Sequence, residues 1–174
     1  MNLSSNNILL TGTPGIGKTT AIKQIVEKLS HKKLSGFWSN EIREAGKRVG
    51  FSIETLSGKF GVLAHVNLRI GPIVSRYRVN IEDINSIIVP ELENARRSCR
   101  IIIIDEIAKM ELFSEQFKGE VRKCLDTRRV VGTIQEQRDP FIDEVRSRSD
   151  VILFKLTTSN RNQIPLQILE MLKA

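Results

Sequence analysis

Residues 12–19 have the sequence GTPGIGKT, which matches the pattern G-x-x-x-x-G-K-[ST]. Glycines at this spacing let the backbone turn sharply and point successive N–H groups inward, where they can bind phosphate oxygens. The ammonium group of Lys18 adds a mobile positive charge, and the hydroxyl group of Thr19 can ligate Mg²⁺. The pattern therefore predicts a loop that binds the phosphate groups of a nucleotide.

This pattern indicates a phosphate-binding loop only where a strand precedes it and a helix follows it. An apolar run at residues 8–10 precedes the loop, and the residues after it have apolar side chains at helical spacing, namely Ile22, Ile25, Val26 and Leu29. The N-terminal end of such a helix is positive and faces a bound anion. This context favours a phosphate-binding loop over a chance glycine-rich turn.

A second set of reactive residues follows the β-branched run at 101–104, which is typical of a strand buried on both faces. The run ends in Asp105 and Glu106. At the C-terminal edge of a central strand next to the loop, Asp105 would hold Mg²⁺ through a water molecule, alongside Thr19. Glu106 would orient the water that attacks the γ-phosphorus and accept its proton. On its own, an acidic pair after a strand is more often a helix cap, but the upstream loop reverses that preference.

The acidic pair favours hydrolysis by a mechanism unlike that of switch-type GTPases, in which a glutamine usually orients the water. The guanine-reading tetrapeptide N-K-x-D is absent, and no other segment is suited to reading a base edge. We therefore expect ATP, GTP, CTP and UTP all to be substrates.

Two alternatives use the same loop: a nucleotide or nucleoside kinase, and a nucleotide-dependent switch that binds nucleic acid. A kinase usually needs an arginine-rich lid, and the chain has no long insertion of that kind.

Length and composition indicate a soluble globular protein. A chain of 174 residues is close to the commonest domain size, so we expect one domain over residues 1–174. The first seven residues lack the pattern of a signal peptide, and no uncharged apolar run approaches the roughly 20 residues that span a membrane. These absences predict a cytoplasmic protein without membrane contacts.

The net charge of +7 suits a nucleic acid, a small polyphosphate or solubility alone. Basic residues are spread along the chain, and one Trp, one Tyr and seven Phe give few aromatic rings for stacking on single strands. The sequence therefore favours a nucleotide over a nucleic acid as the anionic partner.

The cysteines and histidines do not suggest a metal site. Cys99 and Cys124 lack C-x-x-C spacing, and His31 and His65 stand alone. This pattern disfavours a disulfide framework or a zinc site, and we expect both thiols to be buried and free.

Apolar runs alternate with helical patterns along the chain, which predicts an α/β fold with a central, mostly parallel sheet flanked by helices. After the first strand we expect strands at residues 34–38, 101–104, 130–134 and 151–156. Residues 49–55 alternate in polarity, and a turn at Ser57 and Gly58 leads into 60–66, which predicts an antiparallel hairpin added to the sheet.

Several local signals place the helices. Apolar residues at helical spacing over 84–95 predict a helix, which Pro90 should kink or split. Ser114 is suited to cap a helix over 117–125, and Asp139 with Pro140 to start a short one. A closing helix is expected over 164–172.

These segments closely resemble the THEP-type nucleoside-triphosphatases, also called cancer-related nucleoside-triphosphatases. The resemblance covers nearly the whole chain and rests on GTPGIGKTT at 12–20, FWSNEIREAGKRVGF at 37–51, IIIIDEIAKMELFS at 101–114, VVGTI at 130–134 and TTSNRNQIP at 157–165. The first motif is shared with very many NTPases, whereas the second and third together are specific to this family.

The resemblance implies a P-loop fold similar to the RecA-like and kinase-like cores. It also implies Mg²⁺-dependent hydrolysis of ATP, GTP and other nucleoside triphosphates to diphosphate and phosphate, with little base preference. The predicted catalytic residues are Lys18 and Glu106, and the predicted metal ligands are Thr19 and Asp105. The predicted nucleotide-binding residues are Gly12, Thr13, Pro14, Gly15, Ile16, Gly17, Lys18, Thr19, Thr20, Ile102, Ile103, Ile104, Asp105, Glu106, Ile107, Ala108 and Lys109.

Two positions depart from the family pattern. Ala108 stands where the family usually has Gly, and its Cβ restricts a backbone that a phosphate or water could approach. Gln135 stands where the family often has Pro, so the loop that follows is expected to take a different path.

Other side chains have two interpretations each. Glu41 and Arg43 could reach the substrate or form a local ion pair, and Lys109 could add charge at the phosphates or stay solvated. Trp38 could stack on a base or belong to the core.

Fast hydrolysis often needs an arginine finger, and no motif identifies one here. Without such a finger we expect slow turnover. The candidates are Arg138, Arg146, Arg148 and Arg161, with Arg161 favoured because it lies in the family-like SNRN segment.

Overall fold

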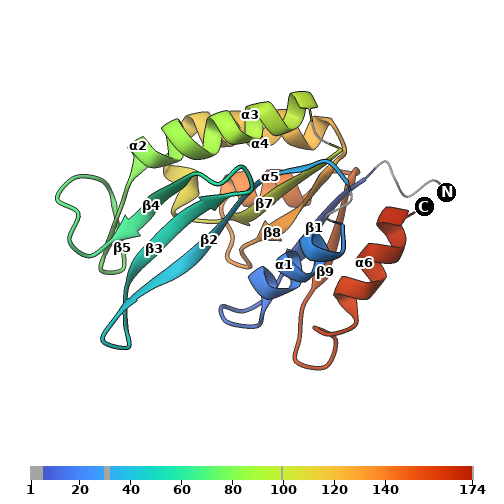
Figure 1. Cartoon of the computed structure of the whole chain (residues 1–174), viewed down its shortest axis with the longest axis horizontal. Coiled ribbons are helices and arrows are strands. Elements are labelled where there is room, and N and C mark those ends of the chain that lie inside the picture. The colour runs from blue at the N-terminus through green and yellow to red at the C-terminus, as the bar shows by residue number, and fades with distance from the viewer. Residues whose placement is uncertain (1–5, 30–31, 99, 174) are drawn as a thin grey trace.

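The computed structural model describes residues 6–29, 32–98 and 100–173. These residues form one nine-stranded sheet in the order β5-β6-β4-β3-β2-β7-β8-β1-β9 (Figure 1). The second half of that order is parallel throughout. Its members are β2 (Leu34–Glu44), β7 (Ile101–Ile107), β8 (Val130–Ile134), β1 (Asn7–Thr11) and β9 (Val151–Lys155). The predicted α/β class is confirmed.

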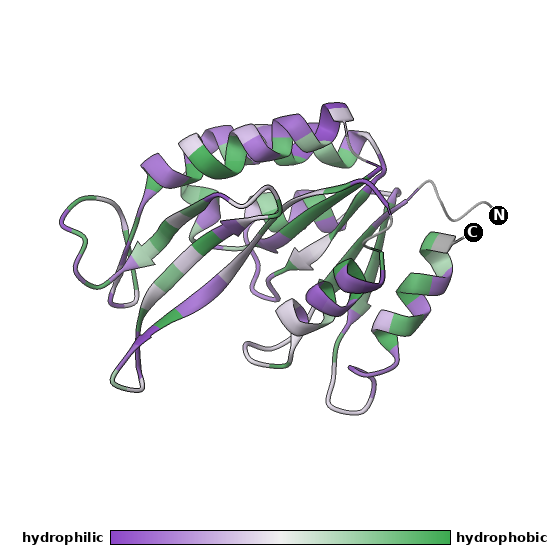
Figure 2. Cartoon of the chain, viewed as in Figure 1, coloured by the Kyte–Doolittle hydropathy of each residue, from purple (hydrophilic) through white to green (hydrophobic). Residues whose placement is uncertain are grey.

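The antiparallel part of the sheet is larger than the single predicted hairpin. It comprises β3 (Lys47–Thr55), β4 (Phe60–His65), β6 (Tyr77–Val79) and β5 (Ile73–Val74). Strand β2 continues past the predicted end at 38 and turns through Ala45 and Gly46 into β3. The sequence did not reveal this second hairpin because its tip projects beyond the helices and is largely hydrophilic, so it needs no apolar face (Figure 2).

Helices cover both faces of the sheet (Figure 1). On one face lie α1 (Lys18–Lys28) and α6 (Ile164–Lys173), and on the other lie α3 (Val89–Ser98), α4 (Glu115–Asp126) and α5 (Pro140–Arg146). Successive side chains of a strand point to opposite faces, so Ile103 packs with the first group while Ile102 and Ile104 pack with the second. This double burial is why the strand at 101–104 is a continuous apolar run.

Local signals in the sequence predicted several helix ends correctly. Ser114 Oγ accepts a hydrogen bond from Phe117 N, and Asp139 Oδ1 accepts one from Phe141 N. The helix interrupted near Pro90 is also found, as α2 (Ile81–Asp83), a π-helical segment η2 (Ile84–Ile88) and α3. The π-helical segment ends two residues before Pro90, which has no N–H group to donate.

Cys124 is fully buried and free, as expected, and burial raises the pKa of its thiol to about 12. His65 lies in β4, whereas Cys99 and His31 lie outside the described residues. Among the helices of the described segments, none is long and apolar enough to cross a membrane.

The strands that carry the two predicted reactive segments are not neighbours. The sequence placed the acidic strand next to the loop, but β8 lies between β1 and β7 and pairs with both. Since all three strands are parallel, their C-terminal ends open onto the same edge of the sheet. The loop after β1 and the acidic pair in β7 therefore still meet, with β8 between them.

The hydrogen bond that caps α5 should contribute measurably to stability. Asp139→Ala removes the acceptor of the Phe141 N–H group, so we expect the free energy of unfolding to fall by about 1 kcal/mol. Urea denaturation followed by circular dichroism measures the change. Asp139→Asn keeps an acceptor of the same shape and should lose much less; an equal loss in both variants would rule out the cap as the cause.

Candidate active site

The loop at residues 12–19 joins β1 to α1 at the C-terminal edge of the parallel strands. Gly15 and Gly17 have φ angles of 80° and 109°, a region that favours glycine because it carries no Cβ. Gly17 is also the N-cap of α1. The N–H groups at the start of α1 therefore have no partner within the helix and lie next to the loop. A helix N-terminus arranged in this way binds anions.

Lys18 holds its ammonium group inside this site. The side chain is 11% exposed, its Nζ donates a hydrogen bond to Gly12 O at 2.9 Å, and it lies 3.5 Å from Glu106 Oε1. One positive charge is thus fixed between the loop and the acidic segment.

Asp105 lies beneath the cleft, with 1% of its surface exposed. Its Oδ1 accepts a hydrogen bond from Thr133 Oγ1 at 2.5 Å, whereas its buried Oδ2 has no partner among the described residues. Burial raises the pKa of Asp105, and the hydrogen bond from Thr133 together with the nearby Thr19 hydroxyl group partly offsets that shift. An unpartnered carboxylate oxygen beside a threonine hydroxyl group is an oxygen donor set of the kind that Mg²⁺ prefers.

Thr133 was not singled out from the sequence. It is fully buried in β8, the strand between β1 and β7, and its hydroxyl group orients Asp105. The available signal was a lone polar residue near the C-terminal end of an apolar strand, V-V-G-T-I.

Glu106 faces the cleft with 26% of its side chain exposed. Burial raises the pKa of this carboxyl group, the charge of Lys18 lowers it, and the neighbouring Asp105 raises it. The carboxylate is therefore more basic than an exposed one, and its single cationic neighbour is also the cation of the phosphate loop.

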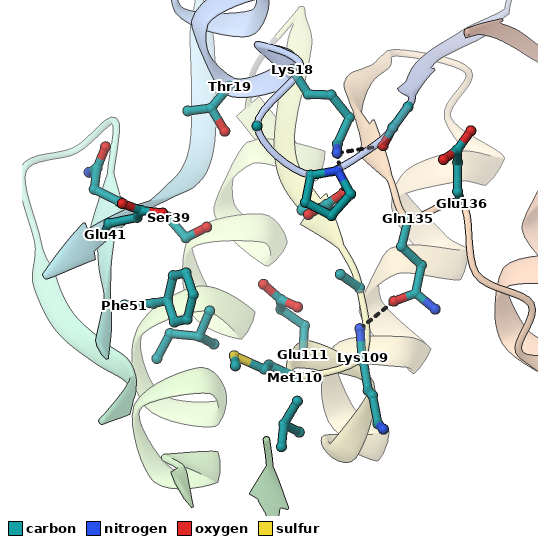
Figure 3. A pocket seen from close by; sticks show the side chains of 18 of the residues that line it. Lys18, Thr19, Ser39, Glu41, Phe51, Lys109, Met110, Glu111, Gln135 and Glu136 are labelled. Carbon is teal, nitrogen blue, oxygen red and sulfur yellow. Dashed lines mark hydrogen bonds and ion pairs between the residues drawn. The ribbon is translucent and has the colours of Figure 1, made fainter. Parts of the chain in front are cut away.

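A cleft of about 670 Å³ runs from the loop to strands β2 and β3 (Figure 3). Most of the predicted loop residues line it, namely Gly12, Pro14, Gly15, Gly17, Lys18, Thr19 and Thr20. Thr13 is exposed outside the lining, and Ile16 packs against the core beneath α1.

The predicted residues of the acidic segment divide into two groups. Glu106, Ala108 and Lys109 line the cleft. The remaining side chains are buried and do not line the cleft; they are Ile102, Ile103, Ile104, Asp105 and Ile107.

The two departures from the family pattern have structural consequences. Ala108 has none of the positive φ angles that would require glycine, so its Cβ is accommodated. Gln135 Oε1 accepts a hydrogen bond from Lys109 N at 2.8 Å, and Gln135 Nε2 donates to Gln137 O at 3.1 Å. Gln135 thus links the segments that follow β7 and β8, while the Lys109 ammonium group points away from Lys18 (Figure 3).

The predicted local ion pair of Glu41 is found, and because Glu41 also lines the cleft, its contact with a substrate stays a prediction. Its partners are Arg43 and Arg48, with shortest distances of 2.6 Å and 2.9 Å. Arg48 also lines the cleft, whereas Arg43 does not. Trp38 lies outside the lining and donates from Nε1 to Glu54 Oε2 at 2.9 Å.

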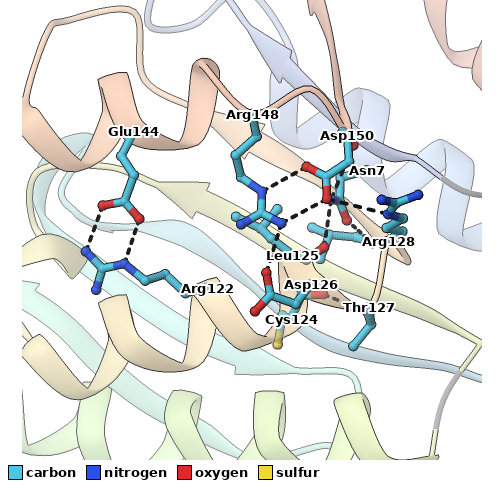
Figure 4. A network of polar contacts seen from close by, with 11 residues as sticks. Asn7, Arg122, Cys124, Leu125, Asp126, Thr127, Arg128, Glu144, Arg148 and Asp150 are labelled. Carbon is cyan, nitrogen blue, oxygen red and sulfur yellow. Dashed lines mark hydrogen bonds and ion pairs between the residues drawn. The ribbon is translucent and has the colours of Figure 1, made fainter.

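None of the four arginine-finger candidates lines the cleft. Arg148 bridges Asp126 and Asp150 at the opposite edge of the sheet (Figure 4). Arg146 donates to Glu136 O and Thr11 Oγ1, and Arg138 pairs with Asp143. Arg161 is exposed beyond β9. The cleft arginine is Arg48, which the sequence did not single out.

Glu111 is a further carboxyl group without a role assigned from the sequence. It lies in the short helix η3 (Glu111–Phe113), is 2% exposed, and points into the cleft (Figure 3). Its Oε2 has no partner in the described part of the chain. Burial raises its pKa well above the ordinary value of 4.5, and the charges of Glu106 and Asp105 raise it further.

Comparison with known proteins identifies close relatives. The family model described as NTPase matches residues 7–169. The nucleoside-triphosphatase THEP1 of Thermotoga sp. (strain RQ2) is 45% identical over 167 residues, which are 95% of each chain. The cancer-related nucleoside-triphosphatase homolog of Mus musculus is 42% identical and covers 92% of this chain and 93% of its own.

Two solved structures share the fold. The crystal structure of THEP1 from Aquifex aeolicus has a TM-score of 0.88 and 38% identity, and the match covers 97% of this chain and 99% of that one. The solution structure of a human cancer-related nucleoside triphosphatase has a TM-score of 0.80 at 38% identity, covering 95% of this chain and 96% of its own.

Glu111 should make stability depend on pH. The folded state binds its proton more tightly than the unfolded chain does, so the free energy of unfolding should fall as the pH rises above 4.5. Glu111→Gln has no proton to lose, and its stability relative to the unsubstituted protein should therefore increase with pH. Urea denaturation at several values between about pH 5 and pH 8 measures this difference.

Glu44→Gln is the matched control, since Glu44 is exposed near the tip of the β2–β3 hairpin. Its effect should be small at every pH. A stability difference for Glu111→Gln that stays constant over the same range would show that Glu111 is not held protonated by the fold.

Proposed function

The chain belongs to the NTPase family, as its motifs predicted, and on that premise we propose that it hydrolyses nucleoside 5′-triphosphates to diphosphate and phosphate with Mg²⁺. We further propose low base selectivity and slow turnover. The observation that carries the proposal is the convergence of Lys18, Thr19, Asp105 and Glu106 from two non-adjacent strands onto one end of the cleft.

The phosphate loop supplies the groups that bind the triphosphate. Backbone N–H groups of residues 15–19 and the N-terminal end of α1 favour the β- and γ-phosphates. Lys18 adds a full positive charge within a cleft that partly excludes water, where charge–charge interactions are stronger than in bulk solvent. Because these groups are already in place, little reorganisation accompanies the reaction.

Thr19 and Asp105 are the proposed Mg²⁺ ligands. The Oδ1 atom of Asp105 is occupied by Thr133, which leaves the unpartnered Oδ2 for the ion or its water. A bound Mg²⁺ would neutralise negative charge on the phosphate oxygens. The charge of the ion would also keep Asp105 ionised against the effect of its burial.

Glu106 is the proposed general base. A base is most effective when its pKa lies near the working pH, and burial shifts the pKa of Glu106 upward in that direction. Lys18, 3.5 Å away, offsets the shift and keeps the carboxylate available to accept a proton. The same pair places the base next to the loop that binds the γ-phosphate.

The expectation of slow turnover is supported by the arginine positions. The candidates Arg138, Arg146 and Arg148 are engaged with other groups, and Arg48 pairs with Glu41. Among the described residues that line the cleft, no arginine is therefore free to contact the γ-phosphate. An arginine in that position accelerates γ-phosphate hydrolysis by orders of magnitude in other P-loop enzymes.

Phosphate release from ATP, GTP, CTP and UTP tests the proposed substrate class. A site that makes no hydrogen bonds to the base should give kcat/KM values within about tenfold of one another. Replacing Mg²⁺ by EDTA should lower the rate by at least about 100-fold, because the metal neutralises transition-state charge. Strong preference for one base, or release that persists in EDTA, would contradict the proposal.

Glu106→Gln tests the proposed base. Nucleotide affinity should be retained, while kcat should fall by about 10²- to 10⁴-fold because the water loses its proton acceptor. Single-turnover phosphate release and calorimetric binding of a nonhydrolysable analogue separate the two quantities.

Glu93→Gln is the matched control, since Glu93 lies on α3 and pairs with Arg97 outside the cleft. Its rate should equal that of the unsubstituted protein. Lys18→Ala, in contrast, should lose turnover altogether. Hydrolysis by Glu106→Gln at an undiminished rate would show that another group activates the water.

A further inference from the structure

The cleft does not end at the acidic pair. Across from the phosphate loop it includes a distal chamber, defined here by an apolar wall and a polar rim (Figure 3). The wall consists of Phe51, Leu63, Val74 and Met110, and the rim consists of Ser39, Glu41 and Arg48.

The proposed triphosphate tail does not account for this chamber. Lys18 lies at the loop, whereas Glu111 lies next to Met110 on the other side of the cleft (Figure 3). With the γ-phosphate between Lys18 and Glu106, the chamber begins where the triphosphate ends. The cleft volume of about 670 Å³ is also that of a pocket for a whole small molecule.

The chamber has the chemistry of a site for a planar ring with a polar edge. Phe51 is half-buried and packs edge-on against Tyr77 with ring centroids 5.3 Å apart, which holds the aromatic side chain in place. The guanidinium group of Arg48 lies 5.1 Å from the Phe51 ring centroid and pairs with Glu41. A heterocycle could contact the apolar wall while its polar edge meets the hydroxyl, carboxylate and guanidinium groups of the rim.

Glu111 is the second, independent observation that points to a ligand. Its carboxyl group is 98% buried, points into the cleft, and leaves Oε2 without a partner among the described residues. Buried polar atoms are nearly always satisfied, and an exception is expected where a bound molecule supplies the partner. A hydrogen-bond donor such as the hydroxyl group of a bound molecule would satisfy this oxygen.

We propose that the distal chamber binds a nucleoside, and that the nucleoside hydroxyl group competes with water for the γ-phosphoryl group. The inference rests on the proposed function, because the donor is the same bound triphosphate. An uncharged nucleoside fits better than a nucleotide, since the carboxylate of Glu106 would repel a phosphorylated acceptor.

The transfer reaction needs no reactant beyond the bound triphosphate and the nucleoside. The hydroxyl oxygen forms a bond to the γ-phosphorus as the bond from that phosphorus to the β–γ bridging oxygen breaks. The departing diphosphate keeps the electron pair, and Glu106 accepts the hydroxyl proton. The products are a nucleoside diphosphate, a nucleoside monophosphate and one proton.

The test uses ATP labelled in its γ-phosphate, the full chain and Mg²⁺. Adenosine, guanosine, cytidine, uridine and thymidine are added one at a time, and glycerol serves as an alcohol without a planar ring. We expect labelled nucleoside monophosphate from at least one nucleoside, at least about tenfold more than labelled glycerol phosphate at equal concentration.

The outcomes separate the inference from the proposed function. Labelled phosphate released without any labelled nucleoside, or transfer to glycerol as efficient as to nucleosides, would overturn the inference and leave the hydrolase intact. No labelled product of either kind would overturn both. Labelled nucleoside with no free phosphate would support the inference and contradict hydrolysis as the main activity.

Phe51→Leu locates the acceptor site. Leucine keeps an apolar side chain but loses the flat ring face, so the apparent KM for the nucleoside should rise about tenfold. Phe60→Leu is the matched control, because Phe60 is 70% exposed on β4 and outside the cleft lining, and it should change nothing. Urea denaturation checks that both variants are folded. Continued transfer with a KM changed less than about twofold in folded Phe51→Leu would overturn the assignment of this chamber.

Discussion

The arrangement of the site depends on three buried or half-buried carboxyl groups, two of which are influenced by the charge of the Lys18 ammonium group. Asp105, Glu106 and Glu111 gather at one end of the cleft, and Lys18 is the cation closest to the pair that would act on the phosphates. Burying carboxylates without enough positive charge is costly, which is why burial is the largest influence on the pKa of each of them. A divalent cation bound beside these carboxyl groups would offset much of the free-energy cost of burying them.

The sheet order explains how such a cluster can be built. Parallel strands deliver the residues after β1, β7 and β8 to one edge, so groups far apart in the sequence meet without long loops. Strand β8 separates the phosphate loop from the acidic pair and contributes Thr133 between them, where its hydroxyl group fixes Asp105. The antiparallel strands then extend the sheet beyond β2 and form the opposite wall of the cleft.

The sequence predicted the parts of this site that depend on neighbours along the chain. The phosphate loop needs only glycine spacing and the flanking strand and helix, and the caps at Ser114 and Asp139 need only adjacent N–H groups. Thr133, Arg48 and Glu111 were missed as site residues because their significance arises from contacts across the sheet, which no local pattern records. The β2–β3 hairpin was missed for a related reason, since its largely exposed tip at residues 41–48 has no buried face to produce alternation.

Charge balance links the metal, the base and the distal chamber. A triphosphate adds negative charge to an end of the cleft that already holds the carboxyl groups of Asp105, Glu106 and Glu111, against the ammonium group of Lys18. Mg²⁺ between Thr19 and Asp105 would reduce this repulsion near the loop, but its effect weakens with distance toward Glu111. A molecule next to Glu111 therefore has to be neutral and able to share a hydrogen with the carboxyl group. Water and an uncharged alcohol both meet that condition. The apolar wall at Phe51 and Met110 favours an alcohol that carries a planar ring over water.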